Sequence, residues 1–314
     1  MKNVKLLLVT LLAMMMLAAC GNDSNTVDGN ENTSSEGNTS NNQVEDVDNQ
    51  TGESDVTDSL SAEEVLEKST EAMTGLSSYS MEMTTEQEIS MAGEDSINMS
   101  STVKSDISQN PLAMYQVTSV QDADGMMGSM DTETYFTSDG FFVFEPLEQK
   151  WVKLPQEFAD EMNALSDMQS NPAVQLEMLK AYSDNMTLSE EGNSYVLTFE
   201  GSGEQFNEMI GMVSGMMGED MSGMMEEMLS MMTVNELNYV IHVDKETFFQ
   251  TKMTVYMDME MDMEGDTIAS IQEVDATLYN FDEVGEITIP QEVLDNAEEL
   301  SLEDLQELDE QGGV

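Results

Sequence analysis

Cysteine and histidine are nearly missing from this sequence, and arginine is missing altogether. Its 314 residues include one Cys and one His, and nine Lys face 64 acidic residues, which gives a formal charge of −55. One Cys excludes an internal disulfide, and one His excludes most zinc sites. Because nucleic-acid binding depends on basic side chains that neutralise phosphates, the charge balance argues against a nucleic-acid partner.

The motifs of common catalytic sites are also missing. The sequence contains no Gly-x-Ser-x-Gly, no His-Glu-x-x-His and no Gly-rich phosphate loop. Asp and Glu are so frequent that pairs of carboxylates occur by chance, so no pair is assigned as an acid–base dyad. His242 alternates with Val240 in a strand-like segment and is expected to be structural or exposed. We therefore expect a protein that is not an enzyme and has no cofactor.

The N-terminus is typical of a lipoprotein signal. Two lysines precede an apolar run too short to be a committed membrane span, and the run ends in Leu17-Ala18-Ala19-Cys20, which resembles the bacterial lipobox. In such lipoproteins the Cys thiol receives a diacylglyceryl group, and a signal peptidase cuts before the Cys. We expect residues 1–19 to be removed and acylated Cys20 to hold the chain in the lipid bilayer, on the extracytoplasmic face of the bacterial cell membrane. In the alternative, an ordinary secretory signal, Cys20 is incidental.

Composition divides the remaining chain into three parts. Residues 20–60 are rich in Asn, Ser, Thr and acids and have no aromatic residue, so we expect a disordered tether. Residues 61–298 are the expected folded domain, and residues 299–314 form an acidic tail. Within the domain, alternating apolar residues predict long strands joined by short turns at residues 138–140, 191–193 and 244–246. Helical patterns are expected near residues 61–75, where Ser61 and Glu64 form a capping-box pattern, and near residues 156–181 and 203–232. These patterns predict an α+β fold with a large antiparallel sheet and helices on one face.

Methionine is the most unusual feature of the composition, with 32 in the chain. From Met257 to Glu264, Met alternates strictly with acids, so a strand there places thioethers on one face and carboxylates on the other. Three interpretations stay open: plain core, the flexible lining of a cavity for an apolar ligand, and a Cu(I) site at Met257, Met259, Met261 and Met263. The candidates for the cavity lining are Met209, Met212, Met216, Met224, Met228, Met257, Met259, Met261 and Trp151.

Several segments resemble Gram-positive (Bacillota) lipoproteins of the LolA/LppX-like superfamily, including small uncharacterised ones. They are Val65–Ser69 with Leu76–Ser80, Tyr135-Phe136 and Phe142–Phe144 with Trp151–Leu154, Val240–Thr247, and Phe281 with Ile287–Val293. The resemblance implies a strongly curved antiparallel half-barrel, with helices on its concave face and an apolar cavity between, in which relatives carry lipids or lipoproteins. This chain departs in two ways, because LolA is soluble in the periplasm and because the Arg that gates LolA-type cavities has no counterpart here.

These observations lead to three functional hypotheses. The first is an anchored protein that binds a lipid or another apolar ligand between the sheet and the Met-rich helices. The second is a Met-rich lipoprotein that binds or senses Cu(I), and the third is a protein-interaction or regulatory module without a ligand. The acidity has a further interpretation, because a chain exposed to high salt tolerates many like charges. On that interpretation the charge reports the habitat of the protein and not its partner.

Overall fold

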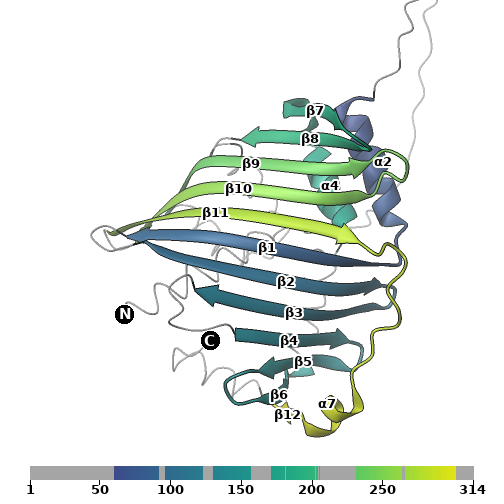
Figure 1. The fold of residues 1–314 in the computed structure, drawn as a ribbon, viewed down its shortest axis with the longest axis vertical. Helices are drawn as coiled ribbons and strands as arrows, with labels where there is room; N and C mark the ends of the chain where they lie inside the picture. The colour runs from purple at the N-terminus through teal and green to yellow at the C-terminus, as the bar shows by residue number, and fades with distance from the viewer. Residues whose placement is uncertain are drawn as a thin grey trace, which may run out of the picture.

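A sheet of twelve strands dominates the computed structural model, which describes residues 60–91, 96–122, 130–156, 171–180, 182–201, 203, 205, 231–263 and 266–301 (Figure 1). The strands are β1 Ser78–Met91, β2 Ile97–Gln109, β3 Leu112–Asp122, β4 Met130–Thr137, β5 Gly140–Glu145, β6 Lys150–Lys153, β7 Met186–Glu191, β8 Ser194–Gly201, β9 Met232–Asp244, β10 Gln250–Met263, β11 Asp266–Tyr279 and β12 Glu298–Glu299. The described helices are α2 Ala62–Thr74, α4 Pro172–Lys180, the 3₁₀ turn η1 Ser183–Asn185 and α7 Gln291–Asn296.

The strand order is β12-β6-β5-β4-β3-β2-β1-β11-β10-β9-β8-β7. All described pairings are antiparallel except that of β12 with β6. The first strand, β1, lies between β2 and β11, so a segment near the start of the domain pairs with one near its end, with Ser80 opposite Tyr279. The predicted α+β fold with a large antiparallel sheet is confirmed.

The hairpin turns form where the sequence predicts them. Gly140 and Gly192 adopt positive φ angles of 131° and 57°, which a residue without Cβ tolerates. Between β9 and β10, the Asp244 carboxylate accepts hydrogen bonds from the backbone N–H groups of Glu246 and Thr247, at 3.0 and 2.9 Å. These bonds lower the pKa of Asp244 and fix the turn.

Helix α2 begins with the predicted capping box. The Ser61 hydroxyl accepts a hydrogen bond from the Glu64 backbone N–H at 3.1 Å, and the Glu64 carboxylate accepts one from the Ser61 N–H at 2.7 Å. Helix α4 begins at Pro172, which has no backbone N–H. This costs no hydrogen bond, because the N–H groups of a helix's first turn have no acceptor within the helix. It is the described part of the helix expected over residues 156–181.

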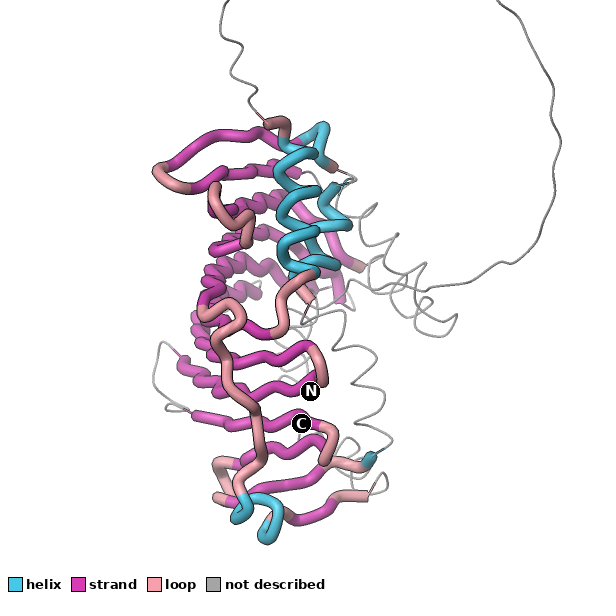
Figure 2. Tube along the Cα trace, turned by 90° about the vertical axis from the view of Figure 1, so that its right-hand side faces the viewer, coloured by secondary structure: helices cyan, strands magenta, loops and turns pink. Residues whose placement is uncertain are grey.

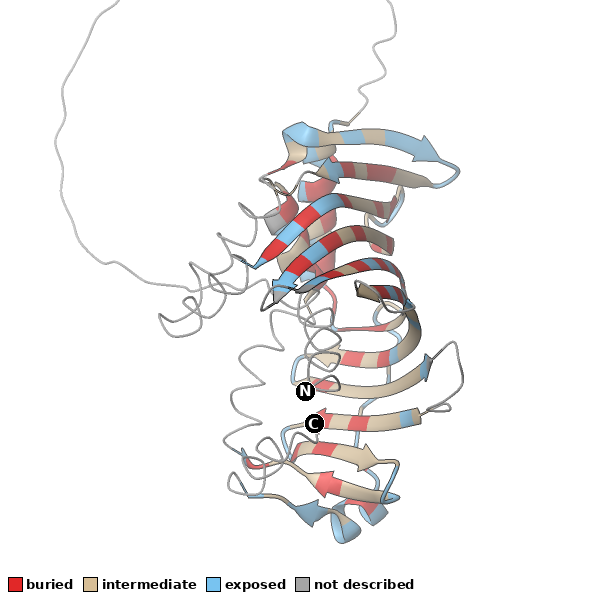
Figure 3. Cartoon of the chain, turned by 90° about the vertical axis from the view of Figure 1, so that its left-hand side faces the viewer, coloured by how far each residue is buried: buried red, intermediate tan, exposed pale blue. Residues whose placement is uncertain are grey.

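Helices α2 and α4 cover one face of the sheet, which we call the inner face. Figure 2 shows the sheet bowed around the side that carries them. Their buried side chains, such as Leu66 and Leu176, join Tyr79, Leu197 and Ile241 from the strands in the largest hydrophobic cluster. Figure 3 shows that buried positions alternate with exposed ones along the central strands, as expected for an antiparallel sheet wet on one side.

Helix α7 belongs to a second cluster at the other end of the sheet. Val293 of α7 and Ile289 pack on Phe142 of β5, with Tyr135 and Trp151 at the edge of the cluster. Tyr79 is on the inner face, and the register through β1–β5 places Tyr135 and Phe142 on the opposite face of the sheet. This second cluster therefore lies on that opposite face, which we call the outer face. The two ends of the sheet therefore bury opposite faces.

Two expected boundaries change in the structure. Met232, expected at the end of a helical block, is the first residue of β9, and its side chain is buried. Glu299, assigned by composition to the acidic tail, pairs with Lys153 as the last residue of β12. The helical pattern of residues 206–230 lies outside the described residues.

Candidate ligand-binding site

On strands β1–β4 and β9–β11, the described side chains of the inner face are uncharged, in a chain of formal charge −55. On β10, Met253, Met257, Met259 and Met261 are buried, and the intervening Glu260 and Asp262 are exposed, which confirms the predicted alternation. The register of the strand pairs assigns the residues of β1–β4, β9 and β11 to the inner or the outer face in the same way. None of the described side chains that the register places on the inner face of these strands is charged. The side chains of Asp122 and Asp266, at the ends of β3 and β11, are not among those described.

Methionines gather at one part of this face, which we call the methionine zone. Met232, Met257 and Met259 form a cluster with Val234, Leu237, Phe199 and Tyr182. The register pairs Met261 with Met232, so thioethers of two neighbouring strands meet. Thioether side chains are flexible and polarizable, and they re-pack around objects of different shape.

Uncharged polar side chains gather on the neighbouring strands, in what we call the amide–hydroxyl zone. The register aligns Ser105, Gln116 and Thr134 across β2, β3 and β4. Ser105 Oγ donates to Gln116 Oε1 at 3.2 Å, and Gln116 Nε2 donates to Thr118 Oγ1 at 3.0 Å. On β1 and β11, Gln87 Nε2 donates to Ser270 Oγ at 3.1 Å, and both residues are buried. The inner face thus offers an apolar surface beside a surface of uncharged hydrogen-bonding groups.

Trp151 does not belong to this face, which corrects its expected role as a cavity residue beside the methionines. The register sets Trp151 opposite Phe144, in the same outward facing as Phe142 and Tyr135. Its ring lies 5.6 Å from Tyr135 and 5.5 Å from Phe144, centroid to centroid. The strand order also places β6 seven strands from β10, a distance of about 34 Å at about 4.8 Å per strand.

The other candidate residues lie in different parts of the chain. Met257, Met259 and Met261 lie together, and whether they contact a ligand stays a prediction. Leu17, Ala18, Ala19, Cys20, Met209, Met212, Met216, Met224 and Met228 lie outside the described residues, as does the side chain of Met263. His242 lies half-buried in outer register, beside Val196 of β8 and Lys252 of β10.

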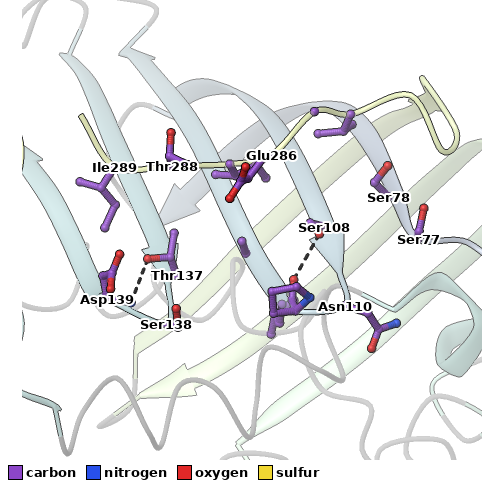
Figure 4. A pocket seen from close by; sticks show the side chains of 16 residues that line it. Ser77, Ser78, Ser108, Asn110, Thr137, Ser138, Asp139, Glu286, Thr288 and Ile289 are labelled. Atoms are coloured by element: carbon purple, nitrogen blue, oxygen red, sulfur yellow. Dashed lines mark hydrogen bonds between the residues drawn. The ribbon is translucent and has the colours of Figure 1, made fainter. Parts of the chain in front are cut away.

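A pocket that the sequence analysis missed lies beneath residues 282–290, which we call the C-terminal strap. The strap crosses the strand ends on its way from β11 to α7 (Figures 1 and 4). The pocket measures about 510 Å³ and is lined by Ser77, Ser78, Ser108, Asn110, Pro111, Leu112, Ala113, Thr137, Ser138, Asp139, Val284, Gly285, Glu286, Ile287, Thr288 and Ile289. Four separate chain segments contribute, and of the turns among them only the one at residues 138–139 was predicted from a local pattern.

The strap is fixed at both ends. At its start the Asp282 carboxylate accepts hydrogen bonds from the backbone N–H and the hydroxyl of Ser77, both at 2.7 Å. These bonds lower the pKa of Asp282, and its own N–H donates to the Ser78 carbonyl at 2.8 Å. At its other end Ile289 is buried in the cluster with Phe142 and Val293. The pocket therefore has a wall that is held in place before any ligand arrives.

No group of three or more His, Cys, Asp or Glu side chains capable of holding a metal ion occurs in the described part of the chain. Among the helices described there, none has the length and hydropathy to cross a bilayer.

The fold and the two faces define a class: an open, mostly antiparallel sheet with a few short helices, whose long strands carry no described charge on their inner face. The chain belongs to DUF6612, a family of unknown function, whose model matches residues 61–298. A comparison with curated proteins gives no match.

A comparison with solved structures gives matches of low similarity. A DUF1329 family protein from Desulfovibrio piger is 13% identical, with a TM-score of 0.26 over 72% of this chain and 93% of that one. A LolA superfamily protein from Nitrosomonas europaea is 9% identical, with a TM-score of 0.24 over 75% of this chain and 97% of that one. A beta-barrel-like DUF1849 protein from Brucella abortus is 7% identical, with a TM-score of 0.22 over 65% and 100%.

Proposed function

We propose that this protein is a membrane-anchored, extracytoplasmic lipoprotein of the LolA/LppX-like superfamily that binds an uncharged amphiphile, such as a neutral lipid, on the inner face of its sheet. The protein has no catalytic role in this proposal. The observation that carries it is the composition of the inner face on β1–β4 and β9–β11: thioethers and aliphatic side chains lie beside amides and hydroxyls, with no charge among the side chains described there.

The two zones match the two parts of an amphiphile. An acyl chain buried against the methionine zone gains about 0.8 kcal/mol per CH₂. A polar head that lies on the amide–hydroxyl zone finds donors and acceptors such as Gln116 and Ser105. An anionic head finds no cation there, and the many carboxylates of the outer face oppose its approach.

Anchoring rests on the lipobox-like Leu17-Ala18-Ala19-Cys20. A diacylated Cys20 supplies the two chains that stable membrane binding requires. Residues 21–60 then form the tether, whose random-coil reach is roughly 35 Å, so the domain can reach past the headgroups. Replacement of Cys20 by Ser is expected to move the protein from the membrane fraction to the soluble fraction. Membrane association unchanged by this substitution would contradict the anchor.

Native mass spectrometry tests the ligand. Residues 21–314, purified from a bacterial host without detergent, should carry an added mass of a lipid. Incubation with vesicles of neutral diacylglycerol and phosphatidylglycerol should load the neutral lipid preferentially. A bare protein mass under both conditions would overturn ligand binding and favour a protein-interaction module.

The pairing of Met261 with Met232 supports a second candidate, binding of Cu(I) by thioethers. Replacement of Met257, Met259 and Met261 by Leu separates the two functions. Leu conserves the apolar volume, so lipid loading should persist. A mass shift with Cu(I) that the triple variant loses, without any lipid loading, would establish the copper function instead.

A further inference from the structure

The pocket beneath the C-terminal strap is chemically distinct from the inner face. Its lining combines uncharged polar side chains with two carboxylates, Asp139 and Glu286, and contains no Lys or His. Pro111, Ala113 and Ile289 add apolar surface. At about 510 Å³, the pocket falls within the range of small-molecule sites, roughly 300–1,000 Å³.

Several of the polar groups are available to a ligand. Ser77 and Ser108 use their hydroxyl protons on Asp282 and on the Pro111 carbonyl, but their oxygens can still accept. Among the described residues, no side-chain hydrogen bond or ion pair engages Ser138, Glu286 or Thr288. Between Asp282 and Ile289, the strap residues Val284–Thr288 also form no backbone hydrogen bond within the described part of the chain.

These groups favour a ligand that donates hydrogen bonds. Carboxylates can only accept, and hydroxyls accept as readily as they donate. A pyranose ring suits the lining, because its hydroxyls point outward around apolar C–H faces. An anionic ligand would meet two carboxylates and no cation, whereas an amine would form charge-assisted hydrogen bonds with Asp139 or Glu286.

We propose that the pocket between the C-terminal strap and the strand ends binds a non-anionic sugar unit, and that it binds an amino sugar most tightly. This site is separate from the amphiphile site and does not depend on it. The strap forms one wall, with Glu286 on it, and the strand ends at Ser108 and Thr137 form the other (Figure 4).

Three sugars of the same ring test the proposal: glucosamine, glucose and glucuronic acid. Saturation-transfer NMR and calorimetry at millimolar sugar and mildly acidic pH should give the affinity order glucosamine, glucose, glucuronic acid. A hydrogen bond to a charged group contributes about 1 kcal/mol more than a neutral one, so glucosamine should bind about fivefold more tightly than glucose.

Substitutions at the pocket sharpen the test. Asp139→Asn with Glu286→Gln should remove the preference for glucosamine over glucose while glucose still binds. The matched control, Asp184→Asn with Glu88→Gln, neutralises one Asp and one Glu at exposed positions away from the pocket and should keep the preference. Thermal melts of both variants verify that each is folded.

The proposal fails if no sugar binds to the folded protein at these concentrations. It also fails if glucuronic acid binds as well as glucosamine, or if the control pair abolishes the preference as fully as the pocket pair. Binding of Ca²⁺ in place of sugar, lost in the pocket variant, would assign the carboxylates to a cation site and overturn the sugar proposal.

Discussion

Glu86 and Glu273 offer a direct test of how the acidic outer face affects stability. The two residues lie directly opposite each other on β1 and β11, and both are exposed. Glu86→Lys reverses the sign of one charge and turns this repulsion into an attraction. The substitution should therefore stabilise the fold, and the gain should depend on salt.

The magnitude follows from Coulomb's law. Two unit charges about 6 Å apart in water interact with about 0.7 kcal/mol, so reversal of one sign changes the energy by about 1.4 kcal/mol. With a Debye length of about 30 Å at 0.01 M salt, about 1.1 kcal/mol of this remains. At 1 M salt the Debye length is about 3 Å and only about 0.2 kcal/mol remains.

Urea unfolding at both salt concentrations measures this gain as a change in midpoint at constant slope. The control is Asp184→Lys, which makes the same change in net charge at an exposed position with no described ion pair or hydrogen bond. The gain of Glu86→Lys over this control isolates the local pair from the general relief of self-repulsion. A gain equal to that of the control, or one as large at 1 M as at 0.01 M salt, would refute the cross-strand repulsion.

Three further predictions concern the helices, the strap and the inner face. Leu176→Ala removes a fully buried side chain of α4 and should cost about 3 kcal/mol in urea unfolding, whereas the exposed Glu177→Ala should cost under about 1 kcal/mol. The pKa of Asp282 is lowered in the folded state, so its contribution to stability is complete above the ordinary value of 3.8. This contribution is lost as the pH falls through the folded-state pKa. In acid unfolding, Asp282→Asn should lack the contribution at every pH. Ser105→Ala with Gln116→Leu should leave the melting temperature unchanged or raise it, because both partners of the bond become apolar, and vesicle loading should lose its preference for a neutral head.

Local patterns predicted those parts of the fold that depend on neighbours in sequence. The capping box at Ser61, the turn at Asp244 and the alternation after Met257 each need only a few adjacent residues, and the structure confirms all three. The pairing of β1 with β11 joins residues about 200 positions apart, and no local pattern encodes that register.

Trp151 shows why the candidate site was only partly predictable. Alternation within a strand separates two faces, but only the register between strands says which face of one strand continues which face of the next. The bonds from β3 through β6 assign Trp151 to the outer face, against α7, and Met257 lies on the inner one. The strap pocket was missed for the same reason, because its walls come from segments that only the tertiary fold brings together.

The exposed carboxylates and the buried amides and hydroxyls of this sheet need different physical explanations. If the acidity is an adaptation to salt, it concerns solvent-exposed carboxylates such as Glu86 and Glu273, which lie where screening is effective. Salt adaptation does not explain Gln87 and Ser270, because both are buried. Leu or Val at these positions would bury no polar group and would cost less desolvation free energy. Buried amides and hydroxyls fix the orientation of the groups that they hydrogen-bond. On this sheet they lie beside the methionine zone, whose thioether side chains adapt their shape. A dry core needs neither property, whereas a surface that orients the head of an amphiphile and accommodates its chain needs both.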